Sequence, residues 1–425
     1  MCHITRQYLL CCAVLLLLLA APLGAADFGL ITNQYVEYGG TGSENHSAAY
    51  QADILPRLSF LLGNVGDGIV SAGMTLGWDE GFYYVPELLR TELSLRSGNN
   101  RIKFGRTSYT DPLGFIASGL FDGMQYSNYS KAGTFSVGAW YTGLLYKENA
   151  NITMTKHDQA LYEAPIDYKN FRNTYCASRR LLVSFDWEHP SLGELVSLKA
   201  ALAGQMDFSQ GADFSKKKER YHSEYFSLKA GIPVKRVLFE LGGSLEAVQS
   251  TAAVQSTAEA AKDPFYTMAF AFDAGIFWTL PTNINSRLSL TGSFAAGKIN
   301  DNDVVSAFVP ITTTTYGDIF EAKLSGITVL GLQYTARLNR VIGTSLSVSH
   351  FVRNDTETYR DYPVPAGKND SHSLGTEFFG RFIWSPLSDL QFNIGGGAFL
   401  PVIGNVSKDA KPLWRVELTA IWAIF

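Results

Sequence analysis

About eighteen segments of this chain alternate apolar and polar side chains, and the connections between them sort by length. In segment 237–248, for example, Phe239 and Leu241 fall on one side and Glu240 on the other. Side chains of a β-strand point alternately to its two faces, so this period predicts strands with one apolar face. The predicted strands are 28–38, 50–62, 69–78, 88–96, 101–107, 119–129, 134–145, 179–188, 194–207, 221–230, 237–248, 265–279, 286–298, 320–338, 341–353, 373–384, 389–401 and 413–425.

The connections between these strands form two classes. Every second one is a short turn, and we expect the intervening ones to run from about nine residues up to the 33 residues of 146–178. A soluble β-sandwich has no reason to sort its loops by side, whereas an outer-membrane barrel has short periplasmic turns and long extracellular loops. We therefore predict an all-β fold, an antiparallel transmembrane β-barrel of about eighteen strands, with sixteen as the next choice.

The composition agrees with a barrel. The chain has 39 glycines and 27 phenylalanines beside only 17% charged residues, and no apolar stretch after the N-terminal segment is long enough for a membrane-spanning helix. Its formal net charge of −4 is the opposite of the basic footprint that nucleic-acid binding requires, so no nucleic-acid partner is expected.

The N-terminal segment predicts export. Arg6 precedes an apolar run, and small residues follow at Gly24 to Ala26, a pattern typical of a secretory signal peptide. We expect residues 1–26 to be removed and 27–425 to form one barrel domain. Cys176 is then the one cysteine left, so no intrachain disulfide is expected.

Four tryptophans occupy similar positions relative to the short turns. Trp187, Trp278 and Trp384 each lie shortly before a proline that opens such a turn, and Trp422 joins them from the last strand. Amphipathic rings belong where lipid headgroups meet hydrocarbon, so the pattern favours an aromatic girdle at the membrane interface. Indoles that merely fill a soluble core would need no such agreement.

The chain ends in an alternating segment, VELTAIWAIF. A barrel must pair its last strand with its first so that no backbone edge faces lipid, and 28–38 is the available partner. This architecture resembles bacterial outer-membrane porins, which end in a similar strand. The resemblance implies that Phe425 is a signal for the barrel-assembly machinery, although here the strongly apolar residues are out of phase with Phe425. It also implies the bacterial outer membrane as location, its lipid as partner, and a homotrimer by analogy.

Polar faces would line the lumen, and the richest patch lies in the predicted strands 50–62, 88–96 and 101–107. Its basic residues, here called the basic wall, are Arg57, Arg90, Arg96, Arg101 and Lys103, with one acid, Glu92, among them. The wall could attract anions or orient a dipolar solute. The alternative is local pairing, for instance of Glu92 with Arg90 or Arg96.

The loop 146–178 is the first candidate for a constriction. In porins, which this chain resembles, basic residues oppose an acidic loop that folds inward, and the acids available here are Glu148, Asp158, Glu163 and Asp167. An extracellular position for this loop is equally consistent with the sequence. In that case 299–319 or 108–118 would narrow the pore.

These observations predict a porin for the passive diffusion of small hydrophilic solutes, because a barrel of this size leaves an aqueous channel. One alternative is a transporter of hydrophobic compounds resembling the long-chain fatty acid transporters, and another is a surface adhesin. The histidines are scattered, with no two at metal-ligand spacing and no nucleophile and base together. We expect no enzyme activity, no catalytic residue, no metal site and no cofactor.

Overall fold

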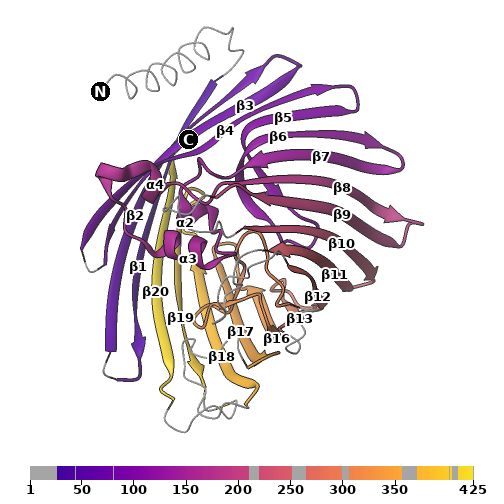
Figure 1. The fold of residues 1–425 in the computed structure, drawn as a ribbon. Helices are drawn as coiled ribbons and strands as arrows, with labels where there is room; N and C mark the ends of the chain where they lie inside the picture. The colour runs from indigo at the N-terminus through magenta and orange to yellow at the C-terminus, as the bar shows by residue number, and fades with distance from the viewer. Residues whose placement is uncertain are drawn as a thin grey trace.

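The computed structural model describes residues 26–43, 45–79, 81–209, 220–250, 265–298, 306–356, 371–401, 403 and 410–424. Within them an eighteen-stranded antiparallel sheet closes on itself, because β1 pairs with β20 from Leu30↔Ile424 to Thr41↔Leu413. Figure 1 shows the resulting barrel with helical segments inside its outline. The predicted barrel and its strand number are confirmed. The signal peptide, apart from Ala26, and Phe425 lie outside the described residues and stay predictions.

The wall strands follow the chain order. They are β1 (Ala26–Thr41), β2 (Asn45–Leu62), β3 (Gly66–Trp78), β4 (Phe82–Ser97), β5 (Asn100–Thr110), β6 (Ser118–Ser130), β7 (Gly133–Tyr141), β8 (Arg180–Leu192), β9 (Val196–Asp207), β10 (Tyr221–Val234), β11 (Val237–Ser250), β12 (Phe265–Thr279), β13 (Arg287–Ala295), β16 (Ile327–Arg337), β17 (Ile342–Arg353), β18 (Ser373–Trp384), β19 (Leu390–Leu400) and β20 (Leu413–Ile424). No helix in the described part of the chain is long and apolar enough to cross a bilayer.

One strand and two connections differ from the prediction. The segment 320–338 is not one strand, since β16 begins at Ile327 after Gly326, whose φ of 58° breaks the extended backbone. Residues 320–326 instead belong to a loop. The first two connections expected to be long, β1–β2 and β3–β4, span only residues 42–44 and 79–81, because the strands continue beyond their apolar parts. The expectation of at least nine residues was wrong for them.

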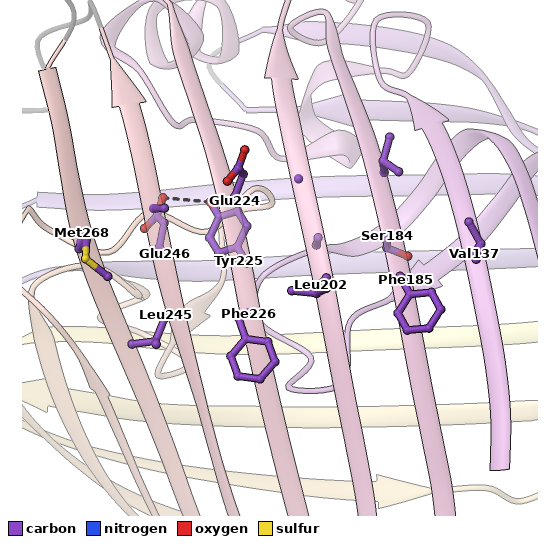
Figure 2. A pocket seen from close by; sticks show the side chains of 14 residues that line it. Val137, Ser184, Phe185, Leu202, Glu224, Tyr225, Phe226, Leu245, Glu246 and Met268 are labelled. Atoms are coloured by element: carbon purple, nitrogen blue, oxygen red, sulfur yellow. Dashed lines mark hydrogen bonds between the residues drawn. The ribbon is translucent and has the colours of Figure 1, made fainter. Parts of the chain in front are cut away.

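The two faces of the wall differ as the alternation predicts. Exposed apolar side chains cover the outside, whereas polar ones alternate with them and point inward. Figure 2 shows this on β7 to β12: Phe226 and Leu245 lie on the opposite side of the sheet from Tyr225 and Glu246, whose hydrogen bond is 3.1 Å. The apolar outside forms a shallow groove there. This is the surface of a barrel that spans a membrane.

One seam of the wall is incompletely paired. β3 pairs with β4 as far as Trp78↔Phe82, and β5 pairs with β6 as far as Thr110↔Ser118. Between β4 and β5, however, pairing runs only from Ser97↔Asn100 to Leu93↔Phe104. The rest of the β4 edge, residues 82–92, has no ladder pairing with a described strand on that side.

Candidate functional site: the narrowed lumen

Three loops narrow the lumen from the long-loop side. They are 111–117, between β5 and β6; 142–179, which carries α2 (Lys147–Ala150), α3 (Lys156–Glu163), η1 (Tyr168–Asn170) and α4 (Phe171–Tyr175); and the described residues of 296–326, namely 296–298 and 306–326, which carry the hairpin β14 (Thr315–Tyr316) and β15 (Ala322–Lys323). Their backbones bond to one another. Ile311 N donates to Ile116 O at 2.7 Å, and Thr313 N donates to Asn151 O at 2.7 Å. The three inward loops therefore act as one assembly.

A core inside the barrel holds these loops against the wall. The ring of Phe308 packs edge-on against Phe115 and against Tyr225 of β10, with centroids 6.2 and 6.0 Å apart. Trp140 of β7 and Leu182 of β8 are buried in the same cluster. Inward apolar residues near the loop side thus serve packing.

Asp111 organises the shortest loop. Its two carboxylate oxygens accept hydrogen bonds from the backbone N–H groups of Leu113, Gly114, Ile116 and Ala117 at 2.8–3.1 Å. Burial raises the pKa of Asp111, and these four donors oppose that rise. The loop is closed on a single buried side chain.

A buried ion pair anchors the loop 142–179. Arg180 Nη2 lies 2.5 Å from Asp158 Oδ2, and both side chains are fully buried. The other nitrogen, Nη1, donates to Gln205 Oε1 at 2.8 Å. Asp158 also belongs to a capping box with Thr155 at the start of α3. The loop is therefore fixed to β8 and β9 by its own helix terminus.

Two wall carboxylates anchor the loop 296–326. Glu246 of β11 accepts from Val309 N at 2.9 Å and from the hydroxyl of Tyr221 at 2.9 Å. Across the lumen, Glu377 of β18 accepts from three consecutive N–H groups, those of residues 318, 319 and 320, at 2.6–3.1 Å. The loop consequently crosses the barrel between fixed points on two parts of the wall.

The crossing loop brings charge to the remaining opening. Asp318 lies 3.3 Å from Arg381, which also contacts Glu417 at 2.9 Å. Glu321 lies 2.8 Å from Arg415. These ion pairs join the loop to β18 and β20 and leave exposed charges of both signs at the edge of the opening.

Lys323 lies where the loop 296–326 meets the loop 142–179. Its Nζ donates to Gln159 Oε1 at 2.7 Å. Burial lowers the pKa of Lys323, while the nearby Glu163 raises it. This contact links the two longer inward loops through side chains.

The basic wall lies below this opening, on β2, β4 and β5. Glu92 pairs with Arg90 at 2.6 Å and with Lys103 at 3.5 Å, while Arg101 Nε donates to Ser94 Oγ at 2.8 Å. The local pairing considered above thus occurs for Arg90. The structure places the remaining two members apart from Glu92: Arg96 lies 3.7 Å from Asp67 near the short turns, and Arg57 is exposed with no ion pair to a described residue.

The four loop acids do not act together against the basic wall. Asp158 is buried with Arg180, and Asp167 is exposed and caps η1. Glu148 and Glu163 are exposed and form no ion pair with the basic wall in the described residues. The acids that do meet arginines at the opening are Asp318 and Glu321. Glu321 was missed because 320–338 was predicted as one strand, and Asp318 was not singled out within the candidate loop 299–319.

The four tryptophans lie near the short-turn ends of their strands. Trp278 pairs with Val237 and Trp384 with Ile342, each beside a short turn, and Trp422 lies opposite Leu390. These three are exposed on the outer face. Trp187 is half-buried, and its indole N–H donates to Ala132 O. Their role as a membrane girdle stays a prediction.

No protein-family model and no curated protein sequence matches the chain. Solved structures do. Pseudomonas aeruginosa OccK5 (OpdH) aligns with a TM-score of 0.59 at 12% identity over 95% of this chain and 99% of that one. The chain has the porin fold.

Two further structures share this porin fold. P. aeruginosa OccK2 (OpdF), solved in complex with glucuronate, gives a TM-score of 0.60 at 12% identity, covering 95% of this chain and 98% of that one. The P. aeruginosa outer membrane protein OpdK gives 0.57 at 10% identity, covering 95% and 99%. None of the three is described as an enzyme. The alignments span nearly the whole chain.

Proposed function

We propose that this chain forms a water-filled channel of the bacterial outer membrane, through which small hydrophilic solutes diffuse passively. The observation that carries the proposal is a closed barrel of eighteen strands whose lumen is narrowed by loops anchored on buried carboxylates. Barrels of this size enclose an aqueous channel unless it is filled. Rigid anchors favour a fixed opening over a mobile lid.

The charge below the opening favours solutes that carry a carboxylate. The basic wall holds five cations, Arg57, Arg90, Arg96, Arg101 and Lys103, and the acids that pair with it are Glu92 and Asp67. Arg57 has no ion pair with a described residue, so its guanidinium is free for a bidentate contact. The glucuronate complex of the similar OccK2 makes a sugar acid the first solute to test.

Planar-bilayer recording and liposome swelling test this proposal. We expect stable single-channel steps, and faster swelling in glucuronate than in glucose, a neutral sugar of similar size. Arg57→Gln should reduce the glucuronate rate and leave glucose uptake unchanged. Absence of any channel would refute the proposed function, and equal rates for both sugars in the wild-type protein would refute the carboxylate preference. A homotrimer, and the assembly role of Phe425, stay predictions.

A further inference from the structure

The incompletely paired seam between β4 and β5 begins at a glycine. Gly105 has a φ of 102°, and a Cβ there would lie 1.8 Å from Thr91 O of β4, so only glycine fits. The next residue, Arg106, donates its backbone N–H to the side chain of Thr91 at 3.1 Å instead of to a strand carbonyl. β5 therefore leaves β4 at this residue, and the two strands do not meet again.

Arg106 spans the seam. On one side its Nε and Nη2 bind both carboxylate oxygens of Asp122, on β6, at 2.9 and 2.8 Å. On the other side Nη1 donates to Leu88 O of β4, and Nη2 also reaches Leu144 O of the loop 142–179 at 3.1 Å. The buried guanidinium thus connects two wall strands that lack a common ladder.

Tyrosines of the loop 142–179 close the rest of the seam, along residues 84–86 of β4. Tyr175 donates its hydroxyl to Pro86 O at 2.8 Å, and Tyr168 donates to Tyr84 O at 2.5 Å. Tyr146 stacks on Tyr175 with ring centroids 4.9 Å apart. The carbonyls of residues 84, 86 and 88 are therefore each satisfied by a side chain. An unpaired carbonyl facing lipid would cost several kcal/mol, which explains why each one is covered.

The seam lies at membrane depth. The β4–β5 ladder below the seam has five paired residues. At about 3.3 Å per residue and a strand tilt of about 40°, the seam starts roughly 12 Å above the short-turn rim, within an apolar band about 25 Å tall. The side chains at its outer mouth are Leu88, Met124 and Leu144, which are 43%, 55% and 55% exposed. Arg90 and Lys103 lie on the lumen side just below it. The seam therefore separates a charged lumen from hydrocarbon.

We propose that this seam is a lateral gate. The side chains of Arg106, Tyr168 and Tyr175 close it, and their displacement opens a path from the lumen into the outer leaflet for amphipathic solutes. The apolar part of the solute leaves between Leu88 and Met124, while its charged end stays near Arg90 and Lys103. Separate side-chain hydrogen bonds can break without unzipping a strand ladder, so this is where the wall opens most easily. The gate requires that the barrel spans a membrane and does not depend on the carboxylate preference proposed above.

Cys176 is a native probe of the gate. It forms an isolated bridge with Tyr146 beside the seam, and it is the one cysteine after residue 26. Two reagents are applied to the protein in liposomes: a maleimide that partitions into the bilayer, such as N-pyrenylmaleimide, and a charged maleimide that stays in water. Burial raises the pKa of the thiol, so both reactions are followed at one mildly alkaline pH.

We expect slow but measurable labelling of the wild-type protein from the bilayer. Arg106→Ala and Tyr175→Ala should raise this rate at least tenfold, and Tyr175→Phe, which keeps the ring, should raise it less. Labelling from water should change less than twofold. Phe135→Ala is the matched control, because this exposed ring packs against Trp187 near the short turns, away from the inward loops and the seam. It should leave both rates unchanged.

Heat-modifiable migration in gels shows which variants are folded, and the comparison uses those alone. No bilayer labelling of the wild-type protein, or rates in Tyr175→Ala and Tyr175→Phe within twofold of the wild-type rate, would overturn the gate. Single-channel recording of the same wild-type preparation separates this outcome from a failure of the proposed channel, since a conducting barrel with a sealed seam refutes only the gate.

Discussion

Asp158 and Arg180 form an ion pair from which water is excluded, with 2.5 Å between Oδ2 and Nη2 and both side chains fully buried. Arg180 begins a wall strand and Asp158 begins α3, so this one contact fixes a loop helix to the barrel. Removing one partner of such a pair leaves the other charge buried without compensation, which is strongly destabilising.

Asp158→Ala is therefore expected to release the loop 142–179. The loss should be about 3 kcal/mol, the lower end for a broken buried pair, because Asp207 remains 3.5 Å from Arg180. Single-channel conductance should rise, with more open-channel noise. Asp167→Ala removes an exposed acid from the same loop and serves as control. Unchanged conductance in Asp158→Ala would show that other contacts hold the loop.

Glu377→Ala should loosen the loop 296–326 at its far end. Three backbone N–H groups lose their acceptor, and each buried orphan costs about 1–3 kcal/mol unless water reaches it. Hydrogen exchange followed by mass spectrometry should show lost protection at residues 318–320. Glu188→Ala removes an acid that pairs with the half-exposed Lys199 near the short turns and should leave that exchange unaltered. Retained protection in Glu377→Ala would contradict the anchoring role.

Reversing the charge of Arg57 should make the channel less favourable to anions. A unit charge at about 4 Å in water is worth about 1 kcal/mol, so the two-unit change is worth about 2 kcal/mol, or roughly a thirtyfold change in relative permeability. The reversal potential of Arg57→Glu in a KCl gradient measures this change. Lys131→Glu alters the net charge equally at an exposed short turn and should shift the potential little. Equal shifts in both variants would mean that Arg57 does not face the ion path.

The docking of the loop 142–179 should strengthen at alkaline pH through Lys147. This buried ammonium donates to Leu161 O at 2.9 Å, and burial lowers its pKa below the ordinary lysine value of 10.5. A pKa lower in the docked state means that docking releases protons. The contribution of Lys147 to docking is therefore complete above pH 10.5 and is lost as pH falls through the lowered pKa. Open-channel noise should decrease as pH rises from 8 towards 10.5, and Lys147→Met should abolish this dependence. A wild-type protein whose noise is independent of pH would refute the prediction.

The wall could be predicted from the sequence because its pattern is local. Apolar and polar residues alternate along every strand of a sheet that has lipid on one face, as Phe239, Glu240 and Leu241 do. The pairing of Arg90 with Glu92 could also be anticipated, since residues two apart share a face. The strand number followed from counting such segments.

The loops could not be predicted in the same way. Asp158 looks like any solvated loop acid, and its partner Arg180 lies at a strand end 22 residues away, so nothing in the spacing joins them. The segment 320–326 alternates apolar and polar residues up to the start of β16, as a strand would, and only Gly326 indicates the break. The seam has no periodic signature, because a proline or glycine such as Pro86 or Gly105 also marks a strand start or a bulge in a fully paired sheet.

The two anchored loops differ in how freely evolution can vary them. Residues of the loop 142–179 complete the wall at Tyr84 and Pro86, so an insertion or deletion there risks a leak into the membrane. The loop 296–326 is held at Glu246 and Glu377, and its span between these points contributes no wall contact at the seam. New substrate preferences should therefore arise first by changes at positions such as Asp318 and Glu321, where a lineage can reshape the pore without unsealing the barrel.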